Sequence, residues 1–397
     1  MAILVFNSGS SSLKLRLYTT ANGQALSLQA RGAIVGIGAQ AAWHWQTRGE
    51  TGQGRVDAPG HREAAAWVLK RLREESTPAV AAVGHRIVHG GDSFTDPVLL
   101  TADTIARIDT LTALAPLHNP PALEVIHACR GEFGDKVPMV AVFDTAFHAT
   151  VPDAARCYAL PETWVRTYGI RRYGFHGIAH RSMYERYLAT GDHAAASARV
   201  ITFQLGNGCS VCAVRNGRSV DTSMGYTPIE GLIMATRSGD VDPGALARLA
   251  AEGVGAAELD ERLNRDSGLL ALSGATGDMR ELLALEAQGH AGARLAVAAF
   301  CYRARKYLGA YLAALGGADA ILFGGGIGEH APQIRERICA DMEWCGVRLD
   351  AAANAAAVGT ERRISPKNAR PQIRVIAVDE EALIARDALA LVASRSG

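Results

Sequence analysis

Residues 5–14, Val5-Phe6-Asn7-Ser8-Gly9-Ser10-Ser11-Ser12-Leu13-Lys14, join two apolar segments through a turn of small hydrogen-bonding residues. The segments at 2–6 and 13–18 have the composition of strands, so we expect a hairpin. Asparagine, glycine and serine in such a turn direct backbone N–H groups and hydroxyls at one point, and the lysine adds a positive charge. The turn therefore suits a phosphate, although an ordinary polar hairpin is the simpler interpretation of this stretch alone.

The composition is that of a globular protein with more than one domain. The 397 residues are 48% hydrophobic and 20% charged, with a net charge of +1. The length favours two domains, and the balanced charge argues against a nucleic-acid or membrane-binding surface. No apolar run reaches the length of a membrane span, and the N-terminus lacks the basic start of a signal peptide. Seven scattered cysteines without a C-x-x-C pair indicate a reducing cytoplasm, without a disulfide framework or zinc site.

Strand-like and helix-like segments alternate along the chain, which predicts α/β domains with helices covering sheets. The predicted strands are 2–6, 13–18, 81–89, 137–143, 199–205, 210–215, 320–323 and 374–378. The predicted helices are 61–75, 104–114, 121–129, 178–188, 291–315, 332–342 and 380–393. A strand, a polar turn and a second strand occur at 2–18 and again at 199–215. We interpret these two hairpins as the openings of a duplicated fold with a cleft between the copies.

Three more glycine-rich turns follow predicted strands, at 205–210 (LGNGCS), 238–240 (SGD) and 323–329 (FGGGIGE). Glycine leaves no side chain between a ligand and the backbone. The helix expected to begin near Pro332 would direct its N-terminus at an anion bound to the last of these turns. Each turn alone is typical of ordinary structure, but together they supply more anion-binding backbone than a structural protein needs. No Walker A motif occurs.

Charged and histidine side chains stand at strand ends and in loops stiffened by glycine or proline. Arg86 and Asp144 each follow or end a predicted strand, and Arg237 lies in the segment TRSGD. His118 precedes two prolines by one residue, and His176 lies between aromatic residues and glycines. Singly, each histidine fits a structural role and each arginine a surface ion pair. An arginine in a glycine-rich strand end can also clamp a carboxylate or phosphate with its planar fork.

Phosphoryl transfer needs this set of groups. Its transition state spreads negative charge over three oxygens, which arginine, protonated histidine and Mg²⁺ stabilise. Mg²⁺ prefers oxygen ligands, and Asn7 and Glu380 could supply them directly or through water. Glu380 fits equally well as a residue in the first turn of a helix, where the dipole favours a carboxylate.

With these residues assembled, the chain resembles the acetate kinase family. Nine segments match in the family's order: NSGSSSLK (7–14), GHRIVHGG (84–91), PLHNPP (116–121), FDTAFH (143–148), YGFHG (173–177), LGNGCS (205–210), TRSGD (236–240), GGGIGE (324–329) and DEE (379–381). The resemblance implies an enzyme that transfers a phosphoryl group from ATP to acetate, giving acetyl phosphate and ADP, by direct in-line transfer with Mg²⁺ or Mn²⁺.

The resemblance also implies the fold of the acetate and sugar kinase, Hsc70 and actin superfamily. Two ribonuclease-H-like α/β domains would close over ATP, with the active site in the cleft between them, and the family forms homodimers. Domain I would comprise residues 1–147, completed by 382–397. Domain II, which would bind the nucleotide, would comprise residues 148–381.

Roles for single residues follow from the same resemblance. The metal ligands would be Asn7 and Glu380. The catalytic residues would be Asp144, His176, Arg237, Arg86 and His118. The nucleotide would contact Lys14, Gln204, Leu205, Gly206, Asn207, Gly208, Asp278, Met279, Arg280, Gly326, Ile327, Gly328, Glu329 and His330. The acyl substrate would contact Arg86, Val88, Leu117, Phe175 and Pro228.

The role of Asp144 follows from the chemistry of the acceptor. In such enzymes this carboxylate is described as a proton donor or acceptor, but a carboxylate substrate is already ionised at neutral pH. A base is therefore not needed. We expect Asp144 to orient the metal and the arginine.

The chain departs from the family pattern at four places. Gln204 stands where a histidine is usual, which removes one cationic phosphate contact. His330 stands where an asparagine is usual near the adenine, Asp379 replaces an asparagine, and Ile178-Ala179 replaces a Thr-Ser pair. None of these changes affects Arg86, Asp144, His176 or Arg237.

Two other functions compete with acetate phosphorylation. A propionate or butyrate kinase could use the same scaffold, since one methylene is worth only about 1–3 kcal/mol of discrimination; Val88 partly closes the pocket and favours acetate. An actin- or Hsc70-like nucleotide-binding module would share the fold, but it needs neither the second arginine nor the two histidines and the acyl pocket.

Overall fold

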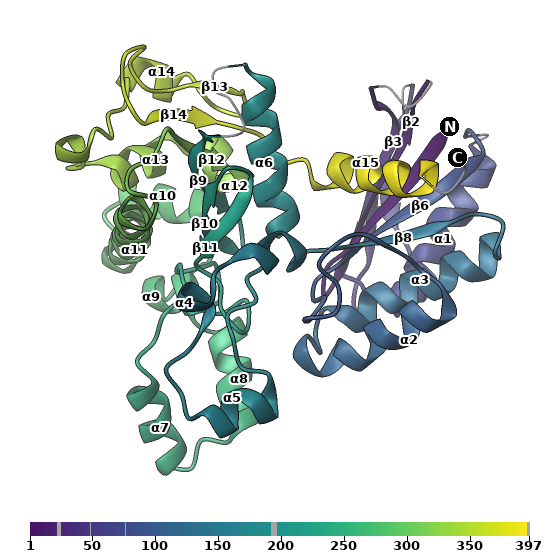
Figure 1. Ribbon diagram of the computed structural model, residues 1–397, viewed down its shortest axis with the longest axis horizontal. Helices are drawn as coiled ribbons and strands as arrows, with labels where there is room; N and C mark the ends of the chain where they lie inside the picture. The colour runs from purple at the N-terminus through teal and green to yellow at the C-terminus, as the bar shows by residue number, and fades with distance from the viewer. Residues whose placement is uncertain (22–24, 48, 76, 192–196, 395–397) are drawn as a thin grey trace. The chain divides into compact units, whose positions relative to one another are not determined.

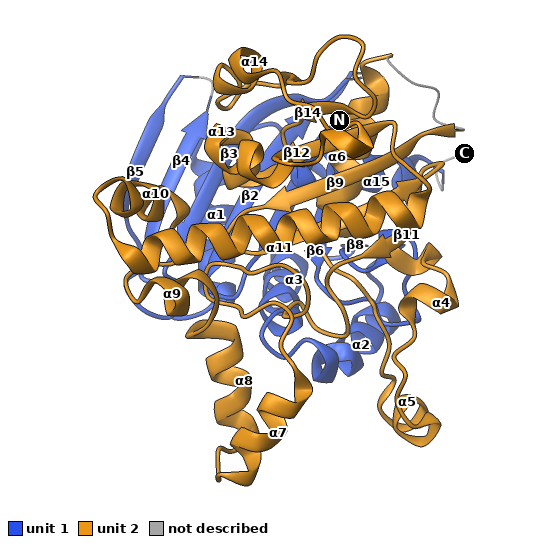
Figure 2. Cartoon of the chain, turned by 90° about the vertical axis from the view of Figure 1, so that its left-hand side faces the viewer, with its two compact units in different colours: residues 1–147, 379–397 blue, residues 148–378 orange. Residues whose placement is uncertain are grey.

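The computed structural model describes residues 1–21, 25–47, 49–75, 77–191 and 197–394 (Figure 1). The chain divides into two compact units (Figure 2). Unit 1 comprises residues 1–147 and 379–397, and unit 2 comprises residues 148–378. The sequence-based boundary placed 379–381 in the second domain, whereas the structure groups them with unit 1. The reason is ionic, because Asp379 and Glu381 both form ion pairs with Arg16 of unit 1.

Unit 1 contains an eight-stranded sheet with the strand order β5-β4-β3-β2-β1-β6-β8-β7. The strands are β1 (Ala2–Ser8), β2 (Ser12–Thr19), β3 (Ser27–Val35), β4 (Ala42–Thr47), β5 (Thr51–Arg55), β6 (Val80–Ile87), β7 (Val98–Leu99) and β8 (Met139–Phe143). Strands β1 to β5 form an antiparallel meander, whereas β6 and β8 run parallel to β1. The predicted hairpin at residues 5–14 is confirmed, and it pairs Asn7 with Lys14.

The two faces of this sheet are covered by different helices. Leu4 and Phe6 of β1, with Leu13 and Leu15 of β2, point from one face into the main core. On that side lie α1 (His61–Glu74) and α3 (Asn119–Phe133), with α2 (Ala102–Thr110) packed on α3. On the opposite face α15 (Glu380–Ala393) packs on β1, β6 and β8 (Figure 1). Gly84 permits this approach, since a Cβ there would lie 2.6 Å from Ile384 Cγ2.

Unit 2 contains a six-stranded sheet with the order β11-β10-β9-β12-β14-β13. Its strands are β9 (Arg199–Leu205), β10 (Cys209–Arg215), β11 (Arg218–Thr222), β12 (Ala320–Gly324), β13 (Arg362–Arg363) and β14 (Gln372–Val375). Strands β9 to β11 are antiparallel, and β12 and β14 run parallel to β9. Unit 1 has the same arrangement in β3-β2-β1-β6-β8. The α/β fold with two related sheets, predicted from the two hairpins, is confirmed.

The helices of unit 2 cover its sheet and extend beyond it. They are α4 (Asp153–Arg156), α5 (Glu162–Tyr168), α6 (Gly177–Ala189), α7 (Pro243–Ala251), α8 (Ala256–Arg265), α9 (Gly268–Ser273), α10 (Met279–Ala287), α11 (Ala291–Leu315), α12 (Gly325–His330), α13 (Pro332–Cys339) and α14 (Ala351–Ala355). Helix α6 packs on β9, and α11 packs on β9 and β10. Helices α5, α7 and α8 contain no buried residue and project from the rest of unit 2 (Figure 2). No helix in the described part of the chain is long and apolar enough to cross a membrane.

The glycine segment at 323–329 differs from the prediction. The helix expected to begin near Pro332 is confirmed as α13, but the glycines before it, expected to form a turn, themselves form α12 directly after β12. Gly325 has a φ of 76°, and a Cβ there would lie 2.6 Å from Leu205 O. The backbone can turn this early because glycine accepts the left-handed conformation at no steric cost. The helix N-terminus nearest the strand end is thus that of α12.

Candidate active site

Seven polar residues of unit 1 form one connected cluster, which we call the polar centre. Its members are Asn7, Arg16, Arg86, Asp144, Asp379, Glu380 and Glu381. The carboxyl ends of the parallel strands β1, β6 and β8 meet at one edge of the sheet and bring Asn7, Arg86 and Asp144 together. The other members come from β2 and from the start of α15, which lies on the same side of the sheet.

The strongest contact in the polar centre joins Arg86 to Asp144. The Arg86 Nε donates to both oxygens of Asp144 at 3.1 Å, and Nη2 donates to Oδ2. The Asp144 side chain is fully buried and that of Arg86 is 15% exposed. Burial opposes the charged form of Arg86, but the carboxylates of Asp144 and Glu380 outweigh it and raise the pKa. Asp144 therefore fixes a charged guanidinium, which agrees with the orienting role expected for it.

Asn7 links this ion pair to α15. Its Oδ1 accepts from Arg86 Nη1 at 3.0 Å, and its Nδ2 donates to Glu380 at 2.8 Å and to Glu381 at 3.0 Å. The two residues expected to bind a metal are thus in direct contact. Glu380 is also the first residue of α15, whose N-cap is Asp379, so its expected place in the first turn of a helix is confirmed, and its role as a metal ligand stays a prediction.

The polar centre carries an excess of negative charge. Four carboxylates and two guanidinium groups give a formal charge of −2 (−4 + 2). Within the described residues, no group of three or more His, Cys, Asp or Glu side chains is arranged to hold a metal. The oxygen-rich cluster therefore fits a cation that keeps several waters, as Mg²⁺ does, and does not form a closed cage.

The other predicted residues of unit 1 are Lys14, Val88, Leu117 and His118. Lys14 is exposed and stands opposite Asn7 in the hairpin. Val88 is buried, Leu117 is exposed, and His118 directly precedes α3. Asn119, to which the sequence analysis gave no role, is fully buried and exchanges hydrogen bonds with both backbone groups of His89 at 3.1 Å. It thereby fixes the loop of Val88 against the loop of His118.

In unit 2 the predicted His176 belongs to a chain of neutral hydrogen bonds, which we call the histidine centre. It comprises His176, Ser210, His180 and Thr202. His176 precedes α6 in a left-handed conformation with a φ of 58°, which costs on the order of 1–3 kcal/mol for a residue other than glycine. Such backbone strain concentrates at functional sites. Burial lowers the pKa of His180 well below its usual value.

Three predicted residues of unit 2 converge next to this centre. A Cβ on Gly208 would lie 3.4 Å from His176 Nε2 and 3.5 Å from Arg237 Nη1, so both side chains approach the turn to contact distance. Arg237 Nη1 donates to Pro228 O at 3.4 Å. Ala235 N donates to Asn207 O at 3.0 Å and joins the Arg237 segment to the same turn. These contacts place two basic side chains beside half-buried glycine backbone.

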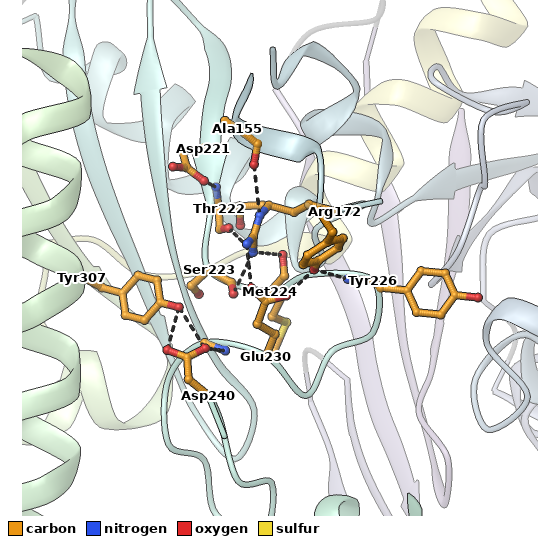
Figure 3. A network of polar contacts seen from close by, with 12 residues as sticks. Ala155, Arg172, Asp221, Thr222, Ser223, Met224, Tyr226, Glu230, Asp240 and Tyr307 are labelled. Carbon is orange, nitrogen blue, oxygen red and sulfur yellow. Dashed lines mark hydrogen bonds and ion pairs between the residues drawn. The ribbon is translucent and has the colours of Figure 1, made fainter. Parts of the chain in front are cut away.

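A network around Arg172 supports this region (Figure 3). Its guanidinium donates to Glu230 at 2.6 Å and to the carbonyl oxygens of Ala155, Thr222, Ser223 and Met224. The Tyr158 hydroxyl donates to the same Glu230 carboxylate. Arg172 lies four residues before His176, and Glu230 lies between Pro228 and Arg237 in sequence. The network therefore ties together the two segments that carry the basic side chains.

The residues expected to bind the nucleotide lie in unit 2, apart from Lys14. Gln204 has a buried Oε1 without a hydrogen-bond partner among the described residues. Glu329 accepts from Gly325 N at 3.0 Å and Val378 N at 3.1 Å, so its side chain holds α12 in place. Asp278 caps α10, and its hydrogen bonds with Arg280 lower its pKa to about 2. The structure places His330 at the end of α12.

Comparison with known proteins agrees with this arrangement. Residues 2–386 match the model of the acetokinase family. This chain belongs to the acetokinase family. The acetokinase is 46% identical to the acetate kinase of Chloroherpeton thalassium, over 98% of both chains. It superposes on the acetate kinase of Porphyromonas gingivalis with a TM-score of 0.91 and 38% identity, covering 98% of this chain and 99% of that one.

A second solved structure is almost as similar. A propionate kinase from Francisella tularensis gives a TM-score of 0.90 and 37% identity, covering 97% of this chain and 98% of that one. The family resemblance seen in the sequence is therefore confirmed over nearly the whole length. The acetokinase is an enzyme, a phosphotransferase with a carboxyl group as acceptor.

Proposed function

We propose that this kinase transfers the γ-phosphoryl group of ATP to acetate, giving acetyl phosphate and ADP in a reversible reaction. The observation that carries the proposal is the connected set Asn7–Arg86–Asp144–Glu380, which combines a fixed cationic fork with an excess of carboxylate oxygens. The cationic fork of Arg86 suits a carboxylate acceptor, and the carboxylate oxygens suit the metal ion of a metal–nucleotide substrate.

In the proposed reaction each basic residue has one task. Arg86, held by Asp144, binds the carboxylate of acetate, which is already ionised and needs no base. Arg237 and His176 donate to the phosphoryl oxygens as charge spreads over them, beside the backbone of Gly208. Asp144 acts on the substrate through Arg86. His118 would contribute a further donor to the phosphoryl group.

Mg²⁺ is the metal that fits the polar centre. Asn7 and Glu380 would hold it, directly or through water, since their oxygens lie in an anionic cluster. When bound, the ion would supply electrostatic stabilisation of the phosphate charge. We assign the nucleotide to Gln204–Gly208, Asp278–Arg280 and Gly326–His330, with Lys14 near the phosphates. The acyl methyl would lie against Val88, Leu117, Phe175 and Pro228.

Formation of acyl hydroxamate tests the proposed function. The protein is incubated with acetate, ATP, Mg²⁺ and hydroxylamine, and we expect acetohydroxamate that disappears when ATP or the metal is left out. A folded protein that binds ATP without forming hydroxamate would instead be a nucleotide-binding module. The same assay over C2, C3 and C4 acids compares kcat/KM, and a preference for propionate or butyrate would refute acetate as the substrate.

We further propose that the kinase is a cytoplasmic homodimer. The seven cysteines are all unpaired, in agreement with a reducing compartment. Helices α5, α7 and α8 bury no residue of their own, and they and their flanks expose Leu160, Trp164, Tyr168, Val241 and Leu249. Exposed apolar side chains on projecting helices suit a second copy of the chain.

Light scattering after gel filtration tests the dimer. Trp164→Glu and Leu249→Glu should each shift the protein to the monomer. Trp344→Glu is the control, because Trp344 is 81% exposed but lies outside these helices. A wild-type monomer, or dissociation by the control alone, would refute this interface.

A further inference from the structure

Ser210 of β10 lies between the two histidines of the histidine centre. Its Oγ is 2.9 Å from His176 Nδ1 and 2.8 Å from His180 Nε2. The second nitrogen of His180, Nδ1, is 2.7 Å from Thr202 Oγ1. Ser210, His180 and Thr202 are all fully buried, so the three groups bond to one another without water.

Thr202, at the end of the chain farthest from His176, sets which group donates in each of these hydrogen bonds. In the described structure the Thr202 hydroxyl has His180 Nδ1 as its one side-chain partner, so its proton must go to that nitrogen or remain unpaired. His180 then carries its own proton on Nε2 and donates it to Ser210. It has only one such proton, because burial keeps it neutral.

The Ser210 hydroxyl has a single proton as well. Since its oxygen accepts from His180, that proton is free to go to His176 Nδ1. A neutral His176 that accepts at Nδ1 carries its proton on Nε2. This nitrogen faces the glycine turn, 3.4 Å from where a Cβ of Gly208 would lie.

We propose that Ser210 is a positioning residue, which with His180 and Thr202 keeps the proton of His176 on Nε2, directed at the phosphoryl group. The inference rests on the proposed function, in which His176 is a donor to that group. It explains how a neutral histidine can stabilise phosphate charge. Each group in the chain donates its proton to the next, from Thr202 through His180 and Ser210 to His176, which then donates to the substrate. Sequence alone did not single out Ser210, because a serine in a strand has no distinguishing pattern.

Unit 2 contains a matched control. Ser219 of β11 is also fully buried, and its Oγ lies 2.9 Å from Nδ1 of another histidine, His148. The Ser219→Ala change removes a buried serine–histidine hydrogen bond and a contact with Cys212 Sγ, whereas Ser210→Ala removes two serine–histidine hydrogen bonds. The Ser219 contacts lie outside the chain that ends at His176. The pair therefore separates loss of packing from loss of His176 orientation.

The test combines kinetics with the NMR spectrum of histidine. We expect Ser210→Ala to lower kcat roughly tenfold to a hundredfold, as loss of a supporting hydrogen bond to an active-site histidine does, with both KM values within twofold. Thr202→Val should lower kcat less, and Ser219→Ala by less than twofold. In ¹⁵N-histidine spectra, His176 should be protonated at Nε2 in the wild type and become a mixture of tautomers in Ser210→Ala.

Each outcome decides one claim. A wild-type His176 protonated at Nδ1, or equal kcat losses in Ser210→Ala and Ser219→Ala, would overturn the inference while hydroxamate formation still supports the proposed function. A wild type that forms no hydroxamate refutes the proposed function, and the spectrum still reports the direction of the chain. If Ser210→Ala does not fold, Ser210→Cys replaces it, since the thiol is similar in size but a weak hydrogen-bond donor.

Discussion

The polar centre of unit 1 and the histidine centre of unit 2 use opposite means to fix their side chains. Unit 1 relies on charge: Arg86 and Arg16 are surrounded by four carboxylates. Unit 2 relies on neutral groups: His176 is held through a serine, a neutral histidine and a threonine. An anionic cluster suits a cation, whereas N–H donors beside glycine backbone suit phosphate oxygens. Related sheets thus present complementary chemistry.

The charged contacts of unit 1 and the neutral hydrogen bonds of unit 2 also differ in how much stability is lost when one partner is removed. Removing one partner of a buried ion pair leaves an uncompensated charge, which costs far more than the pair contributes. Removing a neutral hydrogen bond costs about 1 kcal/mol, or somewhat more when a buried group is left unpaired. Substitutions in unit 1 should therefore affect folding and activity together, and substitutions in unit 2 mainly activity.

The largest effect on kcat without a matching loss of stability is expected for Arg237→Ala in unit 2. Loss of one donor to the transferring group should lower kcat about a hundredfold to a thousandfold. Loss of its hydrogen bond to the neutral Pro228 oxygen should lower the free energy of unfolding by about 1 kcal/mol. Steady-state kinetics and urea unfolding measure both. Arg215→Ala is the control, since Arg215 is exposed and donates to Ala314 O; a comparable kcat loss there would contradict the assignment.

Arg86→Ala tests the opposite behaviour in unit 1. It leaves the Asp144 carboxylate buried without its partner, and we expect unfolding to require about 3–5 kcal/mol less. The double variant Arg86→Met/Asp144→Leu removes both charges and should recover most of this stability. Neither variant should retain activity. If the double variant is as unstable as the single one in urea, the cost does not come from the unpaired carboxylate.

Asn7→Ala should have a smaller, metal-dependent effect. Asn7 orients Glu380 and Arg86 together, so its loss should raise the Mg²⁺ concentration for half-maximal activity roughly tenfold. Titration of activity with Mg²⁺ at saturating ATP measures this. Asn264→Ala on α8 serves as the control. An unchanged Mg²⁺ requirement would show that the metal binds elsewhere.

The smallest effect concerns acid stability and two buried histidines. Burial lowers the pKa of His85 in unit 1 to about 3, below the 6.5 of the unfolded chain. The unfolded state therefore binds more protons between these values. The contribution of neutral His85 to the free energy of unfolding is complete above pH 6.5. It falls by about 1.4 kcal/mol per pH unit as the pH drops below that value toward the pKa of the folded state. His85→Phe should remove that slope and keep the stacking on Phe6.

His148 in unit 2 supplies the comparison. Burial lowers its pKa to about 4, so its contribution to the free energy of unfolding also falls as the pH drops. Both its nitrogens are hydrogen-bonded, to Ser219 Oγ and Phe175 O, whereas His85 Nε2 has no partner among the described residues. His148→Phe should therefore destabilise the protein at pH 7, and His85→Phe should not. Urea unfolding of both variants at pH 5 and pH 7 measures these effects. A loss of stability in His85→Phe at pH 7 would refute the difference proposed between the two histidines.

Much of the fold could be predicted from the sequence where the patterns were strong. The predicted bounds of β9, α11 and α15 agree with the structure. Strands β3 and β5 were missed because their glycines look like turn residues, and β4 between them was not among the predicted strands. In the sheet, Gly52 and Gly54 make room for the ring of Trp43, and Gly32 makes room for that of Trp45. This purpose is visible only once the strands are paired.

The site was predicted unevenly for a similar reason. Asn7 and Glu380 are separated by 373 residues, and only the family resemblance linked them before the structure showed their hydrogen bond. Arg172, Asn119 and Ser210 support predicted residues, but each acts through contacts made by the folded chain. No local pattern marks a residue whose role is to hold another.

The discontinuity of unit 1 has a consequence for biosynthesis. The ribosome completes β1, β6 and β8 before unit 2, but α15, which covers one face of these strands, is made only after unit 2. Until it emerges, that apolar face stays open and Glu380 and Glu381 are missing from the polar centre. The nascent chain should therefore depend on chaperones during synthesis of unit 2. Premature termination before Asp379 would release a protein with one face of its first sheet uncovered and without three of the four carboxylates of the polar centre.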